Sequence, residues 1–178
     1  NVLVGIDERS LIVISLMLHN VTLSRGEAIF LPAGNIHAYL RGVGIELMAS
    51  SDNVLRGGLT PKHIDVPELL RVLDFRPADV PYLRAETPAP GVEVFRPDVA
   101  DFVLTVVNRS TADAMTSVRA RGPVIVLCTT GELLLTDADG SVSVRQGESV
   151  YSVIREGDIS FSGAGTAFVA STSLPFYE

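Results

Sequence analysis

The 178-residue sequence is poor in several residue types, and each scarcity narrows the possibilities. A single cysteine, Cys128, excludes an internal disulfide and fits a reducing compartment, so we expect a cytoplasmic location. The net charge is −7 and no block of basic residues occurs, which argues against a nucleic-acid partner. The longest apolar run, Leu11 to Leu18, is too short to span a bilayer, and no signal-peptide pattern is present, so we expect no membrane partner.

Lysine is almost absent as well. Lys62 is the one lysine among 14 basic residues, and the rest are arginines. In a chain so biased to arginine, the surviving lysine either reflects chance or marks a place that needs a compact ammonium group. The sequence begins at Asn1 rather than Met, which favours a piece of a longer protein.

The first half of the chain carries mixed patterns. Hydrophobic spacing predicts a helix over Asp7–His19, and Asp65 with Glu68 predicts a capped helix that runs to about Asp74. A proline-rich stretch over 76–97 is expected to be a linker with irregular edge structure. Short apolar segments between turn residues predict strands over residues 21–23, 28–31, 37–42 and 44–51, and residues 51–64 are expected to form a long loop.

From Phe102 onward the sequence predicts only short strands, which indicates a small barrel or sandwich. Asp137–Gly140 is predicted to form a hairpin turn. A weak internal repeat joins the two halves, because Val21–Leu31 resembles Val142–Ser152. At the same offset, Asp158 stands where the first copy has His37. Two copies of one β unit, one of which has a candidate ligand, indicate a catalytic barrel and a structural one.

His37 follows a turn made of Pro32, Ala33, Gly34 and Asn35, at the start of a predicted buried strand. Two interpretations stay open from the residues alone: a packed core histidine, or a ligand. Zinc needs three or four nitrogen, oxygen or sulfur ligands, and no H-x-H or C-x-x-C pair accompanies His37.

The loop over 51–64 is the second candidate. Asp52, Arg56 and Lys62 lie there among glycine and threonine residues, with Glu46 on the predicted strand before it. One interpretation is a solvated loop with a weak local ion pair. The other is an anion or polyol site, because Arg and Lys bind phosphates or developing oxyanions and glycines let the backbone approach a ligand.

The segment from Gly26 to Phe75 resembles the signature region of the type I mannose-6-phosphate isomerases, also called phosphomannose isomerases. The pieces GEAIFLPA, HAYL, SDNV-R, GLTPK and DV-EL occur in the family's order and spacing. The resemblance is strong over this segment, weak over the last hundred residues, and implies the C-terminal portion of such an enzyme. It also implies a cupin-type β-barrel or jelly-roll fold, with residues 1–83 completing the catalytic cupin and residues 84–178 forming a cupin-like β domain.

The resemblance further implies a zinc enzyme that interconverts the sugar phosphates mannose 6-phosphate and fructose 6-phosphate through a cis-enediol. It implies a role in carbohydrate metabolism, including GDP-mannose biosynthesis. On this sequence, the metal ligand falls on His37 and the active-site arginine on Arg56, which takes part in proton transfer or stabilises the enediolate. Further implied site residues are Asp52 and Lys62 for catalysis and Tyr39, Glu46 and Lys62 for substrate binding.

The family's other zinc ligands lie upstream of the matching segment, so we expect the 178-residue chain to be metal-free and inactive although its parent is active. The alternative is a non-catalytic, cupin-like sugar-binding or regulatory module in which His37 is structural.

Overall fold

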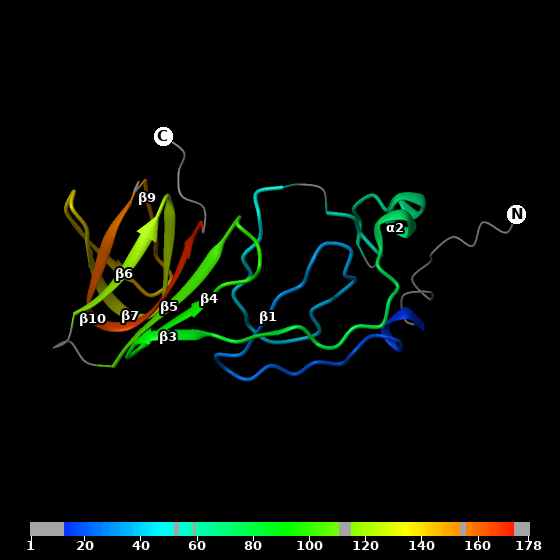
Figure 1. Cartoon of the computed structure of the whole chain (residues 1–178), viewed down its shortest axis with the longest axis horizontal. Coiled ribbons are helices and arrows are strands. Elements are labelled where there is room, and N and C mark those ends of the chain that lie inside the picture. Colours follow the sequence, from blue (N-terminus) through cyan, green and yellow to red (C-terminus); the bar gives the residue numbers. More distant parts are fainter. Residues whose placement is uncertain (1–12, 52–53, 59, 111–114, 154–155, 173–178) are drawn as a thin grey trace, which may run out of the picture. The chain divides into compact units, whose positions relative to one another are not determined.

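The computed structural model describes residues 13–51, 54–58, 60–110, 115–153 and 156–172. The chain divides into two compact units, the first made of Asn1–Ile45 with Ser50–Tyr82 and the second of Glu46–Ala49 with Leu83–Glu178. Among the described residues strands predominate and helix is short (Figure 1). The predicted fold class, mainly β with a few short helices, is therefore confirmed.

The second unit is built from antiparallel strands that curl around a common core (Figure 1). Their order along the sheet is β3-β4-β5-β10-β7-β8, while β6 pairs with β10 and β9 pairs with β7. This all-β body is what the turn signals after Phe102 predict. The strands are β3 (Glu86–Ala89), β4 (Val92–Phe95), β5 (Val103–Arg109), β6 (Thr116–Arg121), β7 (Val124–Thr136), β8 (Ser141–Arg145), β9 (Ser149–Ser152) and β10 (Glu156–Ser171).

The two longest strands, β7 and β10, each change partners along their length. The first part of β10 pairs with β6 and the last part with β5, while β7 pairs with β9 near its start and with β8 near its end. Glycines lie where the two strands bend against each other. A Cβ atom at Gly131 would lie 2.1 Å from the carbonyl oxygen of Ala164, and one at Gly165 would lie 2.3 Å from that of Thr130. Only glycine permits so close a backbone approach.

The core of the second unit follows from alternation along the strands. In β5, residues Val103, Thr105 and Val107 are buried and their neighbours are more exposed, which is the period of a strand with one buried face. Cys128 is completely buried, its Sγ lies 3.3 Å from the carbonyl oxygen of Thr130, and burial raises the pKa of the thiol. The cysteine therefore behaves as a small buried side chain.

The predicted linker over 76–97 is wrong in part. Strands β3 and β4 lie within it, and Val92, Val94 and Phe95 of β4 are buried in the second unit. Proline density concealed this strand because the prolines flank β4 and none lies inside it.

The first unit contains little regular structure. Strand β1 (Ala28–Ile29) pairs with β2 (Tyr82–Leu83), and α2 (Val66–Val72) is a short helix. The strands predicted over 21–23, 37–42 and 44–51 are not formed, and β1 is shorter than predicted. A strand needs a ladder partner for its backbone groups, and the sequence pattern does not show whether a partner is present. The helix predicted over Asp7–His19 lies mostly outside the described residues, of which 13–15 are helical.

Helix α2 begins as its sequence predicts. The carboxylate of Asp65 accepts a hydrogen bond of 3.0 Å from the backbone N–H of Glu68, which satisfies one of the unpaired donors of the first turn. Glu68 pairs with Arg71 one turn later. The helix ends at Val72, two residues before the predicted end, and Leu69 is buried while Leu70 is half exposed.

The internal repeat corresponds to the same turn in both units. In each copy the glycine has a left-handed backbone, with φ of +85° at Gly26 and +84° at Gly147. The next residue is a glutamate whose carboxylate accepts a backbone N–H three residues earlier, at 2.6 Å for Glu27 and 2.8 Å for Glu148. The first copy leads into β1 and the second into β9. A sequence likeness of a few residues therefore marks one recurring structural device.

We predict that Gly131→Ala destabilises the second unit more than Gly147→Ala does. Both glycines have positive φ, which costs alanine about 1 kcal/mol. The methyl group at position 131 also meets backbone atoms, whereas position 147 is open, so Gly131→Ala should lose about 1–3 kcal/mol more. Urea unfolding of the two variants measures the difference, and equal losses would contradict the close approach of the β7 and β10 backbones at Gly131.

Candidate functional site

The turn before His37 is fixed by backbone hydrogen bonds. The N–H of Asn35 donates to the carbonyl oxygen of Pro32 at 3.3 Å, and Gly34 has a φ of +83°, as the third residue of a type II turn requires. The carbonyl oxygen of Gly34 accepts a hydrogen bond of 3.0 Å from the N–H of Asp74, just after α2. The sequence predicts this turn, but not its attachment to the chain beyond α2.

His37 itself is exposed and lies in chain without regular secondary structure, so its interpretation as a packed core residue on a buried strand is wrong. Its Nδ1 atom lies 3.2 Å from the carbonyl oxygen of Asn35. Its ring meets that of Tyr39 edge to face, with ring centres 6.0 Å apart and planes at 77°. Of the predicted site residues, the structure thus brings His37 and Tyr39 into contact.

The remaining predicted residues lie on irregular chain. Arg56 is half-buried, while Lys62 is exposed and its backbone N–H donates to Oγ1 of Thr60 at 3.2 Å. Glu46 is exposed and belongs to the short segment that clusters with the second unit. Asp52 lies outside the described residues. The roles of these residues stay predictions.

The segment after α2 carries a local ion pair. Nε of Arg76 donates to Oδ1 of Asp74 at 2.9 Å, and the backbone N–H of Arg76 donates to the same oxygen at 3.0 Å. These bonds to the guanidinium and the backbone lower the pKa of the Asp74 carboxyl to about 2. Because both side chains are well exposed, the pair holds local geometry rather than the fold.

A zinc ion implied by the family resemblance fits this chain only in part. His37 is exposed and offers one imidazole ligand. Zinc takes three or four ligands, and the described residues contain no group of three or more histidine, cysteine, aspartate or glutamate side chains placed to hold a metal. These residues therefore do not complete a zinc site on their own.

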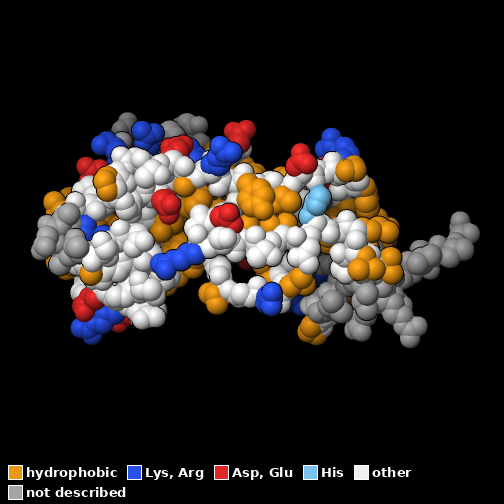
Figure 2. Space-filling view, turned by 90° about the horizontal axis from the view of Figure 1, so that it is seen from below, with side chains coloured by type: hydrophobic (Ala, Val, Ile, Leu, Met, Phe, Trp, Pro, Cys, Tyr) orange, Lys and Arg blue, Asp and Glu red, His pale blue; other side chains and the backbone are white. Residues whose placement is uncertain are grey.

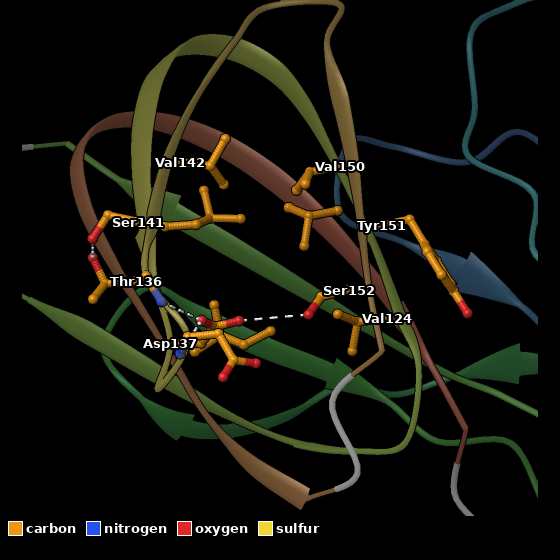
Figure 3. Close-up of a pocket in the computed structure, with 13 residues that line it drawn as sticks. Val124, Thr136, Asp137, Ser141, Val142, Val150, Tyr151 and Ser152 are labelled. Atoms are coloured by element: carbon orange, nitrogen blue, oxygen red, sulfur yellow. Dashed lines mark hydrogen bonds between the residues drawn. The ribbon is translucent and has the colours of Figure 1, made fainter.

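A cavity of about 230 Å³ lies in the second unit, between the ends of β7, β8 and β9. Figure 3 shows Asp137 at its edge, where one carboxylate oxygen accepts from Oγ of Ser152 at 3.5 Å. The other oxygen accepts the backbone N–H groups of Asp139 and Gly140, as an Asx turn requires. Its carboxylate is thus occupied by the predicted hairpin turn, and none of the predicted site residues lines this cavity.

Large apolar side chains lie at the surface of the first unit. If the chain is cut through a catalytic cupin, the sequence predicts exposed apolar side chains at Ile29, Leu31, Ile45 and Leu47; Ile45 is exposed, and the other three are half-buried. Figure 2 shows hydrophobic side chains in patches on one face of the molecule. Among the described residues of this unit, the most exposed large apolar side chains are Leu16, Met17, Tyr39, Leu40, Val43 and Phe75.

None of the described helical segments has the length and apolar composition of a membrane span.

Comparison with known proteins connects these features to one family. The mannose-6-phosphate isomerase of Salmonella typhimurium is 38% identical over 151 residues, which cover 84% of this chain and 38% of that protein. The Bos taurus protein of the same name is 33% identical over 163 residues, covering 89% of this chain and 37% of its own length. The predicted resemblance to the mannose-6-phosphate isomerases is confirmed. No family model matches the chain.

A comparison with solved structures finds the same family as the sequence comparison. A crystal structure of a variant of phosphomannose isomerase from Salmonella typhimurium matches with a TM-score of 0.60 and 29% identity, over 70% of this chain and 32% of that one. This match confirms the cupin-type fold predicted from the resemblance. The chain thus spans well under half the length of the relatives it matches, as expected of one portion of such an enzyme.

We predict that Arg76→Gln raises the pKa of the Asp74 carboxyl from about 2 toward its ordinary value of 3.8, because the guanidinium bonds are lost. A carboxyl with a lowered folded-state pKa stabilises the fold above its ordinary pKa, and this contribution is lost as pH falls toward 2. An NMR titration of the side-chain carbonyl carbon measures the change. Arg71→Gln serves as the control, since Arg71 pairs with Glu68 and should leave Asp74 unchanged.

Proposed function

We propose that this chain is the C-terminal part of a zinc-dependent isomerase that interconverts mannose 6-phosphate and fructose 6-phosphate. In this proposal residues 1–83 supply His37, Arg56 and their neighbours to the active site, and residues 84–178 form a structural cupin-like domain. The parent protein is cytoplasmic and serves carbohydrate metabolism, including GDP-mannose biosynthesis. The likeness to isomerases in sequence and in fold supports the proposal.

One observation carries the assignment of the site. Among the solved structures of the Salmonella typhimurium enzyme are variants in which a histidine, a glutamate or an arginine is replaced. The glutamate and the arginine follow that histidine at the separations at which Glu46 and Arg56 follow His37. The same three residue types at the same separations support a shared site.

Other variants of that enzyme replace two lysines, a second histidine and a second glutamate. At the same offset, all four positions precede the residue that corresponds to Asn1. This arrangement supports an active site divided between the matching segment and sequence upstream of it. It accounts for the incomplete ligand set around His37.

The proposed reaction needs a proton moved between neighbouring carbons. A base removes the proton from C2 of the open-chain aldose, the C–H electron pair forms a C1–C2 double bond, and the aldehyde oxygen gains a proton to give the cis-enediol. The C2 hydroxyl then loses its proton, the electron pair of the C1–C2 double bond takes up a proton at C1, and a ketone is left at C2. Arg56 provides a cation for the oxygen on which negative charge develops, or takes part in the proton transfer itself.

The other residues hold the substrate or assist. Lys62 provides a compact cation for an anionic substrate oxygen, and Asp52 assists proton transfer. Tyr39 and Glu46 bind sugar hydroxyls. A zinc ion, when bound in the parent enzyme, would be held by His37 with upstream ligands and would supply positive charge near the sugar oxygens.

The rate at which the parent protein forms fructose 6-phosphate from mannose 6-phosphate tests the proposal. We expect activity that a chelator abolishes, and neither activity nor tightly bound zinc in the 178-residue chain assayed beside it. Stoichiometric zinc in the chain would contradict the divided site. An inactive parent would contradict the enzyme and leave the sugar-binding or regulatory module.

In the parent protein, Arg56→Gln should lower kcat by about 100- to 1000-fold, because a charge that stabilises the transition state is lost. Steady-state kinetics on mannose 6-phosphate measures the effect. Arg25→Gln is the matched control, since Arg25 is exposed in the repeated turn and should leave kcat unchanged. Equal rates for Arg56→Gln and the unmodified protein would remove Arg56 from the active site.

A further inference from the structure

The cavity between the ends of β7, β8 and β9 has an apolar inner wall. Its volume is about 230 Å³, and the side chains of Val124, Val126, Leu135 and Ile159 that line it are buried. An apolar cavity of about 150 Å³ is large enough to hold benzene. The cavity in the second unit therefore has room for a molecule of that size with one polar substituent.

The mouth of the same cavity is polar. Asp137 follows β7, two residues after the buried Leu135, so strand alternation continues the inward face to a carboxylate. Ser152 is the last residue of β9, and Figure 3 shows its hydroxyl directed toward Asp137. Both residues are half-buried. The hairpin turn adds Asp139, Gly140 and Ser141 to the lining.

The hairpin turn uses only one of the two oxygens of Asp137. Oδ1 accepts the backbone N–H groups of Asp139 at 2.9 Å and Gly140 at 3.1 Å. Oδ2 lies 3.5 Å from Oγ of Ser152, which is long for an O–H···O bond, since these are usually about 2.5–3.0 Å. An asparagine would form the same Asx turn, so the turn does not require a charge. Oδ2 therefore remains able to accept a stronger hydrogen bond from a ligand.

The charge of the lining selects the kind of ligand. Of the described residues that line the cavity, Asp137 and Asp139 are acidic and none is Lys, Arg or His. Such a lining repels an anion, and a carboxylate forms its stronger hydrogen bonds with a cationic donor rather than with a neutral hydroxyl group. The combination of an apolar wall and a carboxylate at the mouth thus fits an ammonium group on a small apolar body.

We infer that this cavity is a binding site for a small primary amine. The ammonium group donates to Oδ2 of Asp137 at the mouth, and the apolar part of the ligand lies against Val126 and Leu135. The site takes a ligand of opposite charge to a sugar phosphate, so it goes beyond the proposed function. It does not depend on that function, because none of the residues proposed for the isomerase reaction lines the cavity.

Two-dimensional ¹H–¹⁵N NMR of the 178-residue chain, at neutral pH and constant ionic strength, tests the site with three probes of similar shape. Benzylammonium should shift the backbone signals of Gly140, Ser141 and Ser152 and should bind about 10-fold more tightly than benzyl alcohol, because its donor is charged. Benzoate should leave these signals unchanged. If benzylammonium does not bind, or if either other probe binds as tightly, the inference is overturned.

A pair of variants tests the role of the carboxylate. Asp137→Asn keeps a side-chain oxygen for the turn and removes the charge, so it should weaken benzylammonium binding by about 10-fold and leave the affinity for benzyl alcohol unchanged. Asp101→Asn is the matched control, because Asp101 is exposed in the second unit and does not line the cavity. Equal benzylammonium affinities in the two variants would overturn the role of Asp137.

Mannose 6-phosphate separates this site from the proposed function. Added to the complex with benzylammonium, it should neither displace the probe nor shift the three backbone signals, because its phosphate is anionic. Displacement of benzylammonium would overturn the selectivity for a cation. An inactive parent protein would overturn the isomerase proposal, whereas the amine site is decided by the NMR titrations alone.

Discussion

The close antiparallel pairing of β7 with β10 is the constraint on which the larger unit depends. Cβ atoms at Gly131, Gly163 and Gly165 would each lie within 2.6 Å of a backbone oxygen of the other strand. Gly163 lies in the middle of β10, between the part that pairs with β6 and the part that pairs with β5, and Gly165 begins the latter part. The buried side chain of Arg109 also donates from Nε to the carbonyl oxygen of Gly163 at 3.0 Å, which ties β5 to the bend.

The glycine–glutamate turn has the same local geometry in both units, but the residues that follow it differ. Both copies have the same left-handed glycine and the same carboxylate-to-backbone hydrogen bond, yet only the first is followed by a histidine. At the corresponding position the second has Asp158, which lies within β10. A shared local geometry thus leads to a regular strand in one unit and to an exposed candidate ligand in the other.

The helix cap and the hairpin turn were predictable from the sequence because hydrogen bonds between residues close in sequence determine them. The cap at Asp65 and the turn at Asp137 follow from side-chain hydrogen bonding to the backbone. The predicted strands around His37 fail because a strand depends on a distant partner, which a single-sequence pattern does not show. Proline density concealed β4 for a similar reason, since its place in the core depends on pairing with β5.

The sequence motif selects the candidate site residues, but it does not give their geometry. Residue types and order led to His37 and Arg56. The contact of His37 with Asn35 depends on the local conformation of the turn, and the attachment of Gly34 to Asp74 depends on tertiary structure. Sequence reasoning also placed Glu46 beside the loop, while the fold groups it with the second unit. The spacing of residues in a motif identifies candidate site residues, whereas their positions relative to one another depend on the fold.

The central claim, that His37 holds the metal of a larger isomerase, is tested most directly by the zinc content of the purified parent protein. Mass spectrometry under native conditions should find about one zinc ion per unmodified protein and per His19→Gln variant, and a strongly reduced content in His37→Gln, since loss of one of a few ligands weakens the site. Equal zinc content in both variants would contradict the account and leave His37 as a surface histidine.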